Sequence, residues 1–214
     1  MPFGFRRSKG DAPVPSPEPA PEEPPGIPFD ALTEDWRLVG RMLVEGRLSD
    51  ALNRREPIDI VDVGWATLDR AEEIVDAPGL RQVDPYDLVI VLGGYRSLPV
   101  MTDEERTAHR IHKVAFYLGL EAPPFKIVGS VYLYPGTDPT RLLDRAPEMF
   151  IPVVEATATM GDQPIGEPGT DIILVNRAYL RGVTSVDSMT GRDIARLPGS
   201  MPPLYPDPRD EEDR

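Results

Sequence analysis

The chain has 214 residues, enough for one ordinary domain or two small ones, and 40% of them are hydrophobic, so a buried core can form. It contains no cysteine, which excludes a disulfide framework and a thiolate metal site, and no apolar run of roughly eighteen residues, which excludes a membrane-spanning helix. The formal net charge of −13 argues against nonspecific binding to the phosphates of nucleic acid.

Residues 1–29 are predicted to form a disordered, proline-rich tail that is extended and partly polyproline II. The first ten residues combine two aromatic and three basic side chains: Phe3, Phe5, Arg6, Arg7 and Lys9. This tip is a candidate for docking on a protein partner or, weakly, on an anionic membrane, and an ordinary frayed terminus is the plain alternative. The tip lacks the apolar stretch of a signal peptide, so we expect a cytoplasmic protein that is at most peripheral to the membrane.

The first folded segments alternate between strand and turn patterns. Residues 35–46 predict a strand with a bend at Gly40, because a glycine inside a strand commonly marks a bulge. Residues 47–54 predict a helical turn, and residues 57–69 alternate as a strand. A loop is expected over residues 69–86, with a turn at Asp84 and Pro85.

Residues 87–100 contain the strongest strand, a branched apolar run that ends at Gly93 and Gly94 in a hairpin turn. Thr102 and Glu105 have the spacing of a capping box, which predicts a short helix over residues 103–110. The pattern of residues 111–120 favours a strand but also allows the helix to continue to residue 118.

A returning strand is predicted over residues 125–136, after a turn at residues 121–124. Asp138 before Pro139 is typical of a helix start, because aspartate can cap the first free N–H groups and proline suits the first helical position. Two further strands are expected over residues 150–160 and 171–183.

Two halves of the chain repeat the same order of features. Residues 36–40 align with 125–129, Leu52 with Leu143, and residues 61–62 with 154–155. Residues 87–91 align with 171–175, which lowers the offset between the copies from about ninety to 84. The polar residues that occupy matched or adjacent places are Asn53, Arg54, Asp144, Arg145, Asn176 and Arg177. A small repeated unit buries little surface alone, so the copies should shield each other.

The second copy resembles an uncharacterised bacterial family, a domain of unknown function. The resemblance rests on Gly129 with the Pro135-Gly136 pair, on the strand from Pro152 to Ala156, and on Val175-Asn176-Arg177. It covers roughly residues 105–187, with a diverged copy at 36–96, and implies architecture without an activity.

The chain is also faintly similar to Sm-like small β-barrels, on the bent strand at Gly40 and on Asp50 and Asn53. In the second copy Asp144 replaces the asparagine, and Asn176 and Arg177 stand where that family has arginine and glycine. The likeness implies an RNA-binding ring, but both RNA-contacting positions are altered.

No pattern in the sequence predicts catalysis. His109 and His112 could hold a metal ion only with further ligands, and surface residues at a helix end are the simpler interpretation. Gly93 and Gly94 lack the remaining glycines of a phosphate loop. We therefore expect no catalytic residue, no metal and no cofactor.

These observations predict a mainly β, β-rich α+β protein built as a tandem repeat of a small β-sheet or barrel unit with short helices. The expected divisions are a tail at residues 1–29, units at 30–100 and 101–187, and an acidic, proline-rich disordered tail at 188–214. The expected function is that of a non-catalytic interaction or scaffold protein with a protein partner. The alternatives are a small-molecule sensor with a pocket between the units, and an Sm-like RNA-binding protein.

Overall fold

The three-dimensional structure is a computed structural model. It describes residues 25–93, 113–144, 148–166, 172–188, 190, 192–197 and 199. The tip at residues 1–10, the predicted helix at 103–110, both histidines, Gly94 and Arg145 lie outside these residues.

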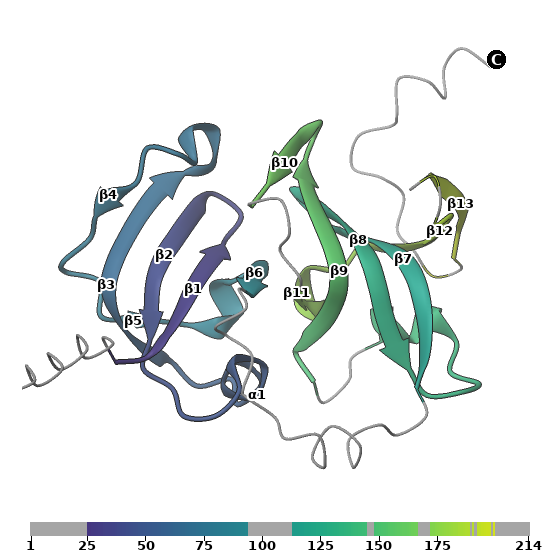
Figure 1. Ribbon diagram of the computed structural model, residues 1–214, viewed down its shortest axis with the longest axis horizontal. Coiled ribbons are helices and arrows are strands. Elements are labelled where there is room, and N and C mark those ends of the chain that lie inside the picture. Colours follow the sequence, from purple (N-terminus) through teal and green to yellow (C-terminus); the bar gives the residue numbers. More distant parts are fainter. Residues whose placement is uncertain are drawn as a thin grey trace, which may run out of the picture.

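The first half of the described chain, up to residue 93, contains six strands and one α-helix (Figure 1). In chain order its elements are β1 (Ile27–Leu32), β2 (Trp36–Met42), α1 (Leu48–Asn53), β3 (Ile58–Thr67), the 3-10 helix η1 (Leu68–Arg70), β4 (Val75–Asp76), β5 (Gln82–Val83), the 3-10 helix η2 (Pro85–Asp87) and β6 (Ile90–Gly93).

The second half, from residue 113, contains seven strands among its described residues. Its elements are β7 (Val114–Ala122), β8 (Phe125–Leu133), the 3-10 helix η4 (Pro139–Leu143), β9 (Phe150–Met160), β10 (Gln163–Ile165), β11 (Ile172–Asn176), the 3-10 helix η5 (Arg177–Tyr179), β12 (Gly182–Val186) and β13 (Asp193–Arg196).

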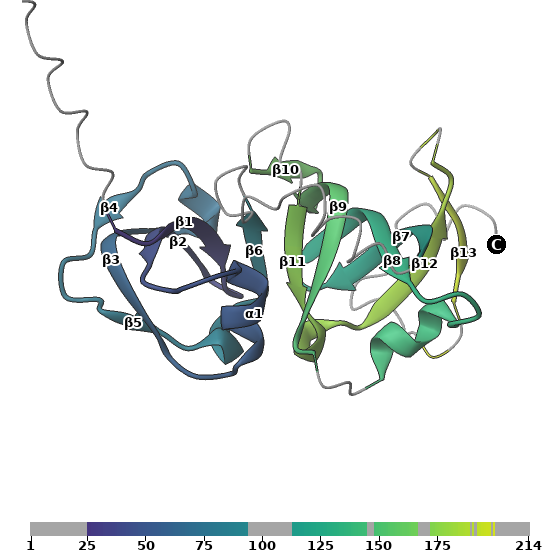
Figure 2. The ribbon, with the colours of Figure 1, turned by 60° about the horizontal axis from the view of Figure 1, so that its bottom comes forward.

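All thirteen strands belong to one antiparallel sheet, in the order β13-β12-β7-β8-β9-β11-β6-β1-β2-β3-β4, with β10 on β9 and β5 on β3. This confirms the predicted mainly β fold. The strand order is open at both ends, so the sheet does not close into the predicted barrel. The two halves meet where β6 pairs with β11 (Figure 2). We call this region the seam, and it includes the strand pair and the neighbouring segments through which the halves contact each other.

The seam strands are apolar except at Asn176, the last residue of β11, and their residues are largely buried. In β6, Ile90 and Leu92 belong to the core of the second half, and Val91 belongs to the core of the first half. In β11, Ile173 packs in the core of the second half and Leu174 in that of the first. A strand covered on both faces gives a continuous apolar run instead of an alternating one, which explains the strongest strand signal in the sequence.

Several predicted elements are confirmed. Residues 114–122 form a strand and not a helix, and α1, β3, β8 and β9 lie where the patterns place them. Asp138 caps η4 by accepting a hydrogen bond from the backbone N–H of Thr140 at 2.9 Å, which lowers the pKa of its carboxyl group. The turn that follows is a 3-10 helix.

One strand prediction and two assignments of residues to the tails were wrong. The strand expected over residues 171–183 is divided into β11 and β12, because Asn176 caps the 3-10 helix η5 between them. The segment Ile27–Leu32, assigned partly to the tail, forms β1 between β2 and β6. Asp193–Arg196, also assigned to a disordered tail, forms β13 on β12, and Arg196 pairs with Glu121 at 2.7 Å.

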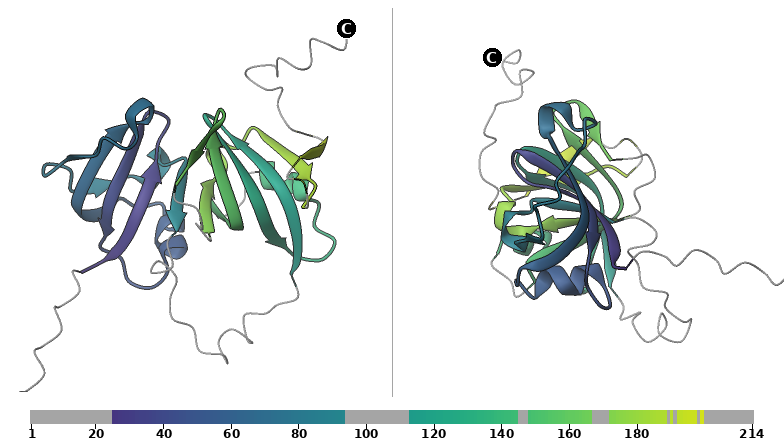
Figure 3. Two further views of the ribbon diagram at one scale, coloured as in Figure 1. Left: turned by 45° about the horizontal axis from the view of Figure 1, so that its top comes forward. Right: turned by 90° about the vertical axis from the view of Figure 1, so that its left-hand side faces the viewer.

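Both long bent strands are interrupted at their glycine. The β2–β3 register shifts between Val39 and Arg41, and the β8–β9 register shifts between Val128 and Ser130. The facing strands have a residue with positive φ at each shift, Asp62 at 53° and Glu155 at 50°. Each interruption is therefore a β-bulge that bends the sheet (Figure 3), as a glycine inside a strand predicts.

The described residues contain no helix with the length and apolar character needed to cross a membrane.

Candidate functional site: a pocket at the seam

Two asparagine side chains bind across the seam in opposite directions. Asn53, at the end of α1, accepts hydrogen bonds from the backbone N–H groups of Met149 and Phe150 at 2.7 and 2.8 Å. Asn176, fully buried at the end of β11, donates to the backbone carbonyl of Leu88 at 2.8 Å and to that of Pro85 at 3.3 Å. Each half therefore satisfies backbone groups of the other, which fixes how the halves meet.

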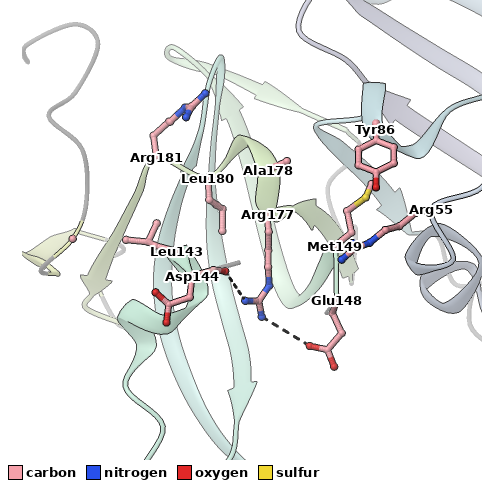
Figure 4. Close-up of a pocket in the computed structure, with 11 residues that line it drawn as sticks. Arg55, Tyr86, Leu143, Asp144, Glu148, Met149, Arg177, Ala178, Leu180 and Arg181 are labelled. Carbon is pink, nitrogen blue, oxygen red and sulfur yellow. Dashed lines mark hydrogen bonds and ion pairs between the residues drawn. The ribbon is translucent and has the colours of Figure 1, made fainter. Parts of the chain in front are cut away.

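Beside these contacts lies a pocket of about 610 Å³, the seam pocket (Figure 4). The first half contributes Arg55 and Tyr86, and the second half contributes residues that include Asp144, Glu148 and Arg177. The sequence brings these groups together through long-range pairing, since η2 and η5 lie side by side where the Tyr179 hydroxyl donates to the carbonyl of Tyr86 at 3.1 Å. Partial burial of the Tyr179 side chain raises the pKa of its hydroxyl group.

Arg177 is the principal charged group of the seam pocket. Its side chain is only 15% exposed, and its Nε is buried without a hydrogen-bond partner among the residues that the structure describes. Nη1 donates to the carbonyls of Arg141 and Asp144 at 3.4 and 3.5 Å, and Nη2 lies 4.0 Å from the carboxylate of Glu148. Burial lowers the pKa of the guanidinium, although Glu148 and Asp144 act in the opposite direction. The guanidinium is thus largely removed from water, and the contacts that described residues make with it are long.

A buried cation without close partners is costly, and a planar guanidinium is suited to two parallel bonds with a carboxylate. Figure 4 shows the Arg177 side chain extending between Asp144 and Glu148, while Arg181 points away from it. Of the described residues that line the pocket, three are arginines, Arg55, Arg177 and the outward-pointing Arg181, and two are acids, in a chain whose overall charge is strongly negative. This arrangement can bind an anionic group.

The described residues that line the seam pocket include no histidine, cysteine, serine or lysine, and their ionisable groups are carboxylates, guanidinium groups and the phenol of Tyr86. Within the described part of the chain, no three side chains of the metal-binding kinds cluster together.

The matched polar residues predicted from the sequence divide into three groups. Asn53, Asp144, Asn176 and Arg177 lie at or beside the seam. Arg54 is exposed and does not line the seam pocket, where its neighbour Arg55 takes part instead. Arg145 and the tip residues Phe3, Phe5, Arg6, Arg7 and Lys9 lie outside the described residues.

Sequence reasoning missed Tyr86 and Glu148 as lining residues. Tyr86 follows the Asp84-Pro85 turn, and the side chain of Asp84 caps this turn by accepting from the N–H of Tyr86 at 2.9 Å. That Asp-Pro signal marked a turn in the sequence, but nothing local indicated that the turn faces residues about ninety positions away.

Comparison of the chain with protein-family models, with curated proteins and with solved structures finds no match.

Proposed function

We propose that this chain is a non-catalytic interaction protein whose seam pocket captures a carboxylate group of its partner. The observation that carries the proposal is the state of Arg177, a buried guanidinium whose Nε has no partner and whose contacts with Arg141, Asp144 and Glu148 are all 3.4 Å or longer. A carboxylate that enters the pocket can form shorter, charge-assisted bonds to the Nη atoms, each of which contributes about 1.5–3 kcal/mol.

The surroundings of Arg177 supply the remaining features of a recognition site. Leu180 and Met149 give the pocket apolar walls, and Glu148, 69% exposed, can move aside when a ligand carboxylate takes its place. The backbone at Met149 is fixed by Asn53, so the ligand meets a pre-organised wall.

We also propose that the two halves are copies of one five-stranded unit. What supports this is a shared strand order, β5-β3-β2-β1-β6 in the first half and β11-β9-β8-β7-β12 in the second. The corresponding strands β5 and β11 are each followed along the chain by a 3-10 helix. The side chain of Asp84 caps η2 after β5, and the side chain of Asn176 caps η5 after β11. The bulges at Gly40 and Gly129, each facing a residue with positive φ, occupy equal places.

This correspondence changes the register of the repeat. It aligns Asp84 with Asn176 and hence β6 with β12, in place of residues 87–91 with 171–175. The offset is then 92 (176 − 84), close to the 89 (129 − 40) between the two bent glycines. The two seam strands β6 and β11 are accordingly different strands of the unit, and their pairing is what joins the copies.

A small-molecule sensor is the second candidate function, because about 610 Å³ lies within the usual range for small-ligand pockets. Both candidate functions require the pocket to bind a carboxylate. The interaction protein would bind a carboxylate on a peptide, and the sensor would bind one on a free metabolite. The strongly acidic chain gives the Sm-like alternative no comparable support.

Replacing Arg177 by methionine should weaken carboxylate binding about tenfold or more, because at least one charge-assisted contact is lost. The measurement is an NMR titration with N-acetylglutamate, with the uncharged diamide N-acetylglutaminamide as the matched probe, following the backbone amides of Asp144, Glu148 and Ala178. Arg54→Met is the control variant, since Arg54 is exposed outside the pocket. Equal shifts with both probes, or equal affinity of Arg177→Met and the unaltered chain, would contradict the proposal.

A second titration, with acidic peptides, distinguishes a carboxylate on a protein partner from a carboxylate on a free metabolite. Acidic peptides that bind at least tenfold more tightly than N-acetylglutamate favour a protein partner, because a peptide adds contacts along the seam. Peptides that bind no better than the single amino acid favour the sensor.

A further inference from the structure

Both tryptophans of the chain lie together at the end of β2 and β3 that precedes η1. Their ring centroids are 4.5 Å apart, and Trp36 and Trp65 are 38% and 37% exposed. In the sheet register Leu38 faces Trp65, and Trp65 faces Val75 of the terminal strand β4, which is 60% exposed. We call Trp36, Leu38, Trp65 and Val75 the Trp patch.

The Trp patch continues the core-facing side of the first half beyond the point where the core covers it. Ala31 of β1 is fully buried and faces Leu38, whereas the next residues in the same row, Trp65 and Val75, reach the surface. Exposed aromatic and branched side chains that adjoin one another are typical of a surface that another segment covers.

The chain segments beside the Trp patch, residues 33–36 and 67–76, are strongly acidic. They carry one basic residue, Arg70, which already pairs with Asp69 and Glu73. Their six acidic residues, all exposed, are Glu34, Asp35, Asp69, Glu72, Glu73 and Asp76, of which Glu72 also pairs with Arg37 at 3.4 Å. A segment that covers the patch should therefore be aromatic and basic.

We propose that the chain's own N-terminal tip, residues 1–10, docks on the Trp patch. The tip has the required chemistry, since Phe3 and Phe5 can cover the tryptophans while Arg6, Arg7 and Lys9 meet the acidic rim. These five residues are the only aromatic and charged side chains of the tip, and all three charges are positive.

The linker is long enough for this contact. Residue 26 precedes β1, whose Ile27 pairs with Met42 at the far end of β2 from Trp36. The distance along β2 is about 20 Å at ~3.4 Å per residue. Residues 11–25 in the polyproline II form span about 45 Å at ~3.1 Å per residue. A tether of this length holds the tip at an effective concentration of the order of millimolar, so even a weak contact is populated.

Tryptophan fluorescence tests the proposal directly, because the chain has two tryptophans and both belong to the patch. Deletion of residues 2–10 should shift the emission to longer wavelength and raise the acrylamide quenching constant roughly twofold, as the tethered cover is lost. Phe3→Ala with Phe5→Ala should reproduce the change at any salt concentration. Arg6→Glu, Arg7→Glu and Lys9→Glu together should also reproduce it, and high salt should expose the patch of the unaltered chain. The control is deletion of the acidic residues 205–214, which should leave the quenching unchanged.

Three results would overturn the proposal. One is equal quenching of the full and shortened chains. Another is protection that grows with protein concentration together with a dimer in sedimentation, which assigns the tip to a second copy. The last is protection that appears only when vesicles containing phosphatidylserine are added, which assigns the tip to a membrane.

Discussion

Asn176→Asp is expected to destabilise the fold by about 3–5 kcal/mol at pH 7, the cost of a buried charge that keeps the N–H of Ala178 as a partner for one oxygen but sets the other oxygen against two carbonyl oxygens. The amide nitrogen of Asn176 donates to the carbonyls of Leu88 and Pro85, and the residue is fully buried. Aspartate would place a negative oxygen against these two carbonyl oxygens. Urea unfolding of the full chain, followed by circular dichroism, measures the change.

The loss should depend on pH in a defined direction. Burial beside carbonyl oxygens raises the pKa of the new carboxyl group in the folded state above its unfolded value of about 3.9. A protonated carboxyl can still donate, so the destabilisation should be smallest below that pH and grow as the pH rises toward neutrality.

The matched control is Asn53→Asp, the same substitution at the other asparagine that binds across the seam. Asn53 uses its oxygen to accept from the N–H groups of Met149 and Phe150, and a carboxylate accepts equally well. We expect it to change stability by less than about 1 kcal/mol. Similar losses from the two variants would show that the two amides do not bind across the seam in opposite directions.

Gly129→Ala is expected to cost about 2–3 kcal/mol, at the upper end of the range for overpacking. A Cβ at this bulge would lie 2.8 Å from Cγ1 of Val153, 2.9 Å from the carbonyl oxygen of Val154 and 3.0 Å from Cα of Ala156. Two of these atoms belong to the backbone of β9, so they cannot turn aside as a flexible side chain can.

Gly79→Ala is the control, because a Cβ at Gly79 meets no atom within 4 Å. It should be neutral or stabilise slightly, since alanine lowers the entropy of the unfolded chain. The free energy of unfolding from urea titrations is compared for both variants. A Gly129→Ala variant as stable as Gly79→Ala would contradict the bulge geometry.

The sequence predicted the strands whose burial is regular along the chain. In β9, Ala156 and Ala158 are buried while Glu155 and Thr157 are exposed, and this pattern was readable. β1 was not readable, because Pro28 cannot donate to a neighbouring strand. The structure tolerates Pro28 because β6 pairs only with Asp30–Leu32 and leaves this position free on that side.

The candidate site was predictable only in part. Comparison of the two halves identified Asn53, Asn176 and Arg177 as matched polar positions, and the structure places all three at the seam. Their partners were not predictable, because the contacts of Asn176 with Leu88 and Pro85 span about ninety residues and depend on how β6 meets β11. A buried cation with poor partners is a tertiary property that no local pattern encodes.

The binding site is expected to exist only where the two halves meet. A protease site placed within residues 94–112 allows the folded chain to be cut and its halves separated in denaturant. Titration of each half with N-acetylglutamate then tests the claim. We expect neither half to bind alone and an equimolar mixture to recover the affinity of the uncut chain. If residues 113–214 alone bind the probe as tightly as the uncut chain does, the site does not belong to the seam.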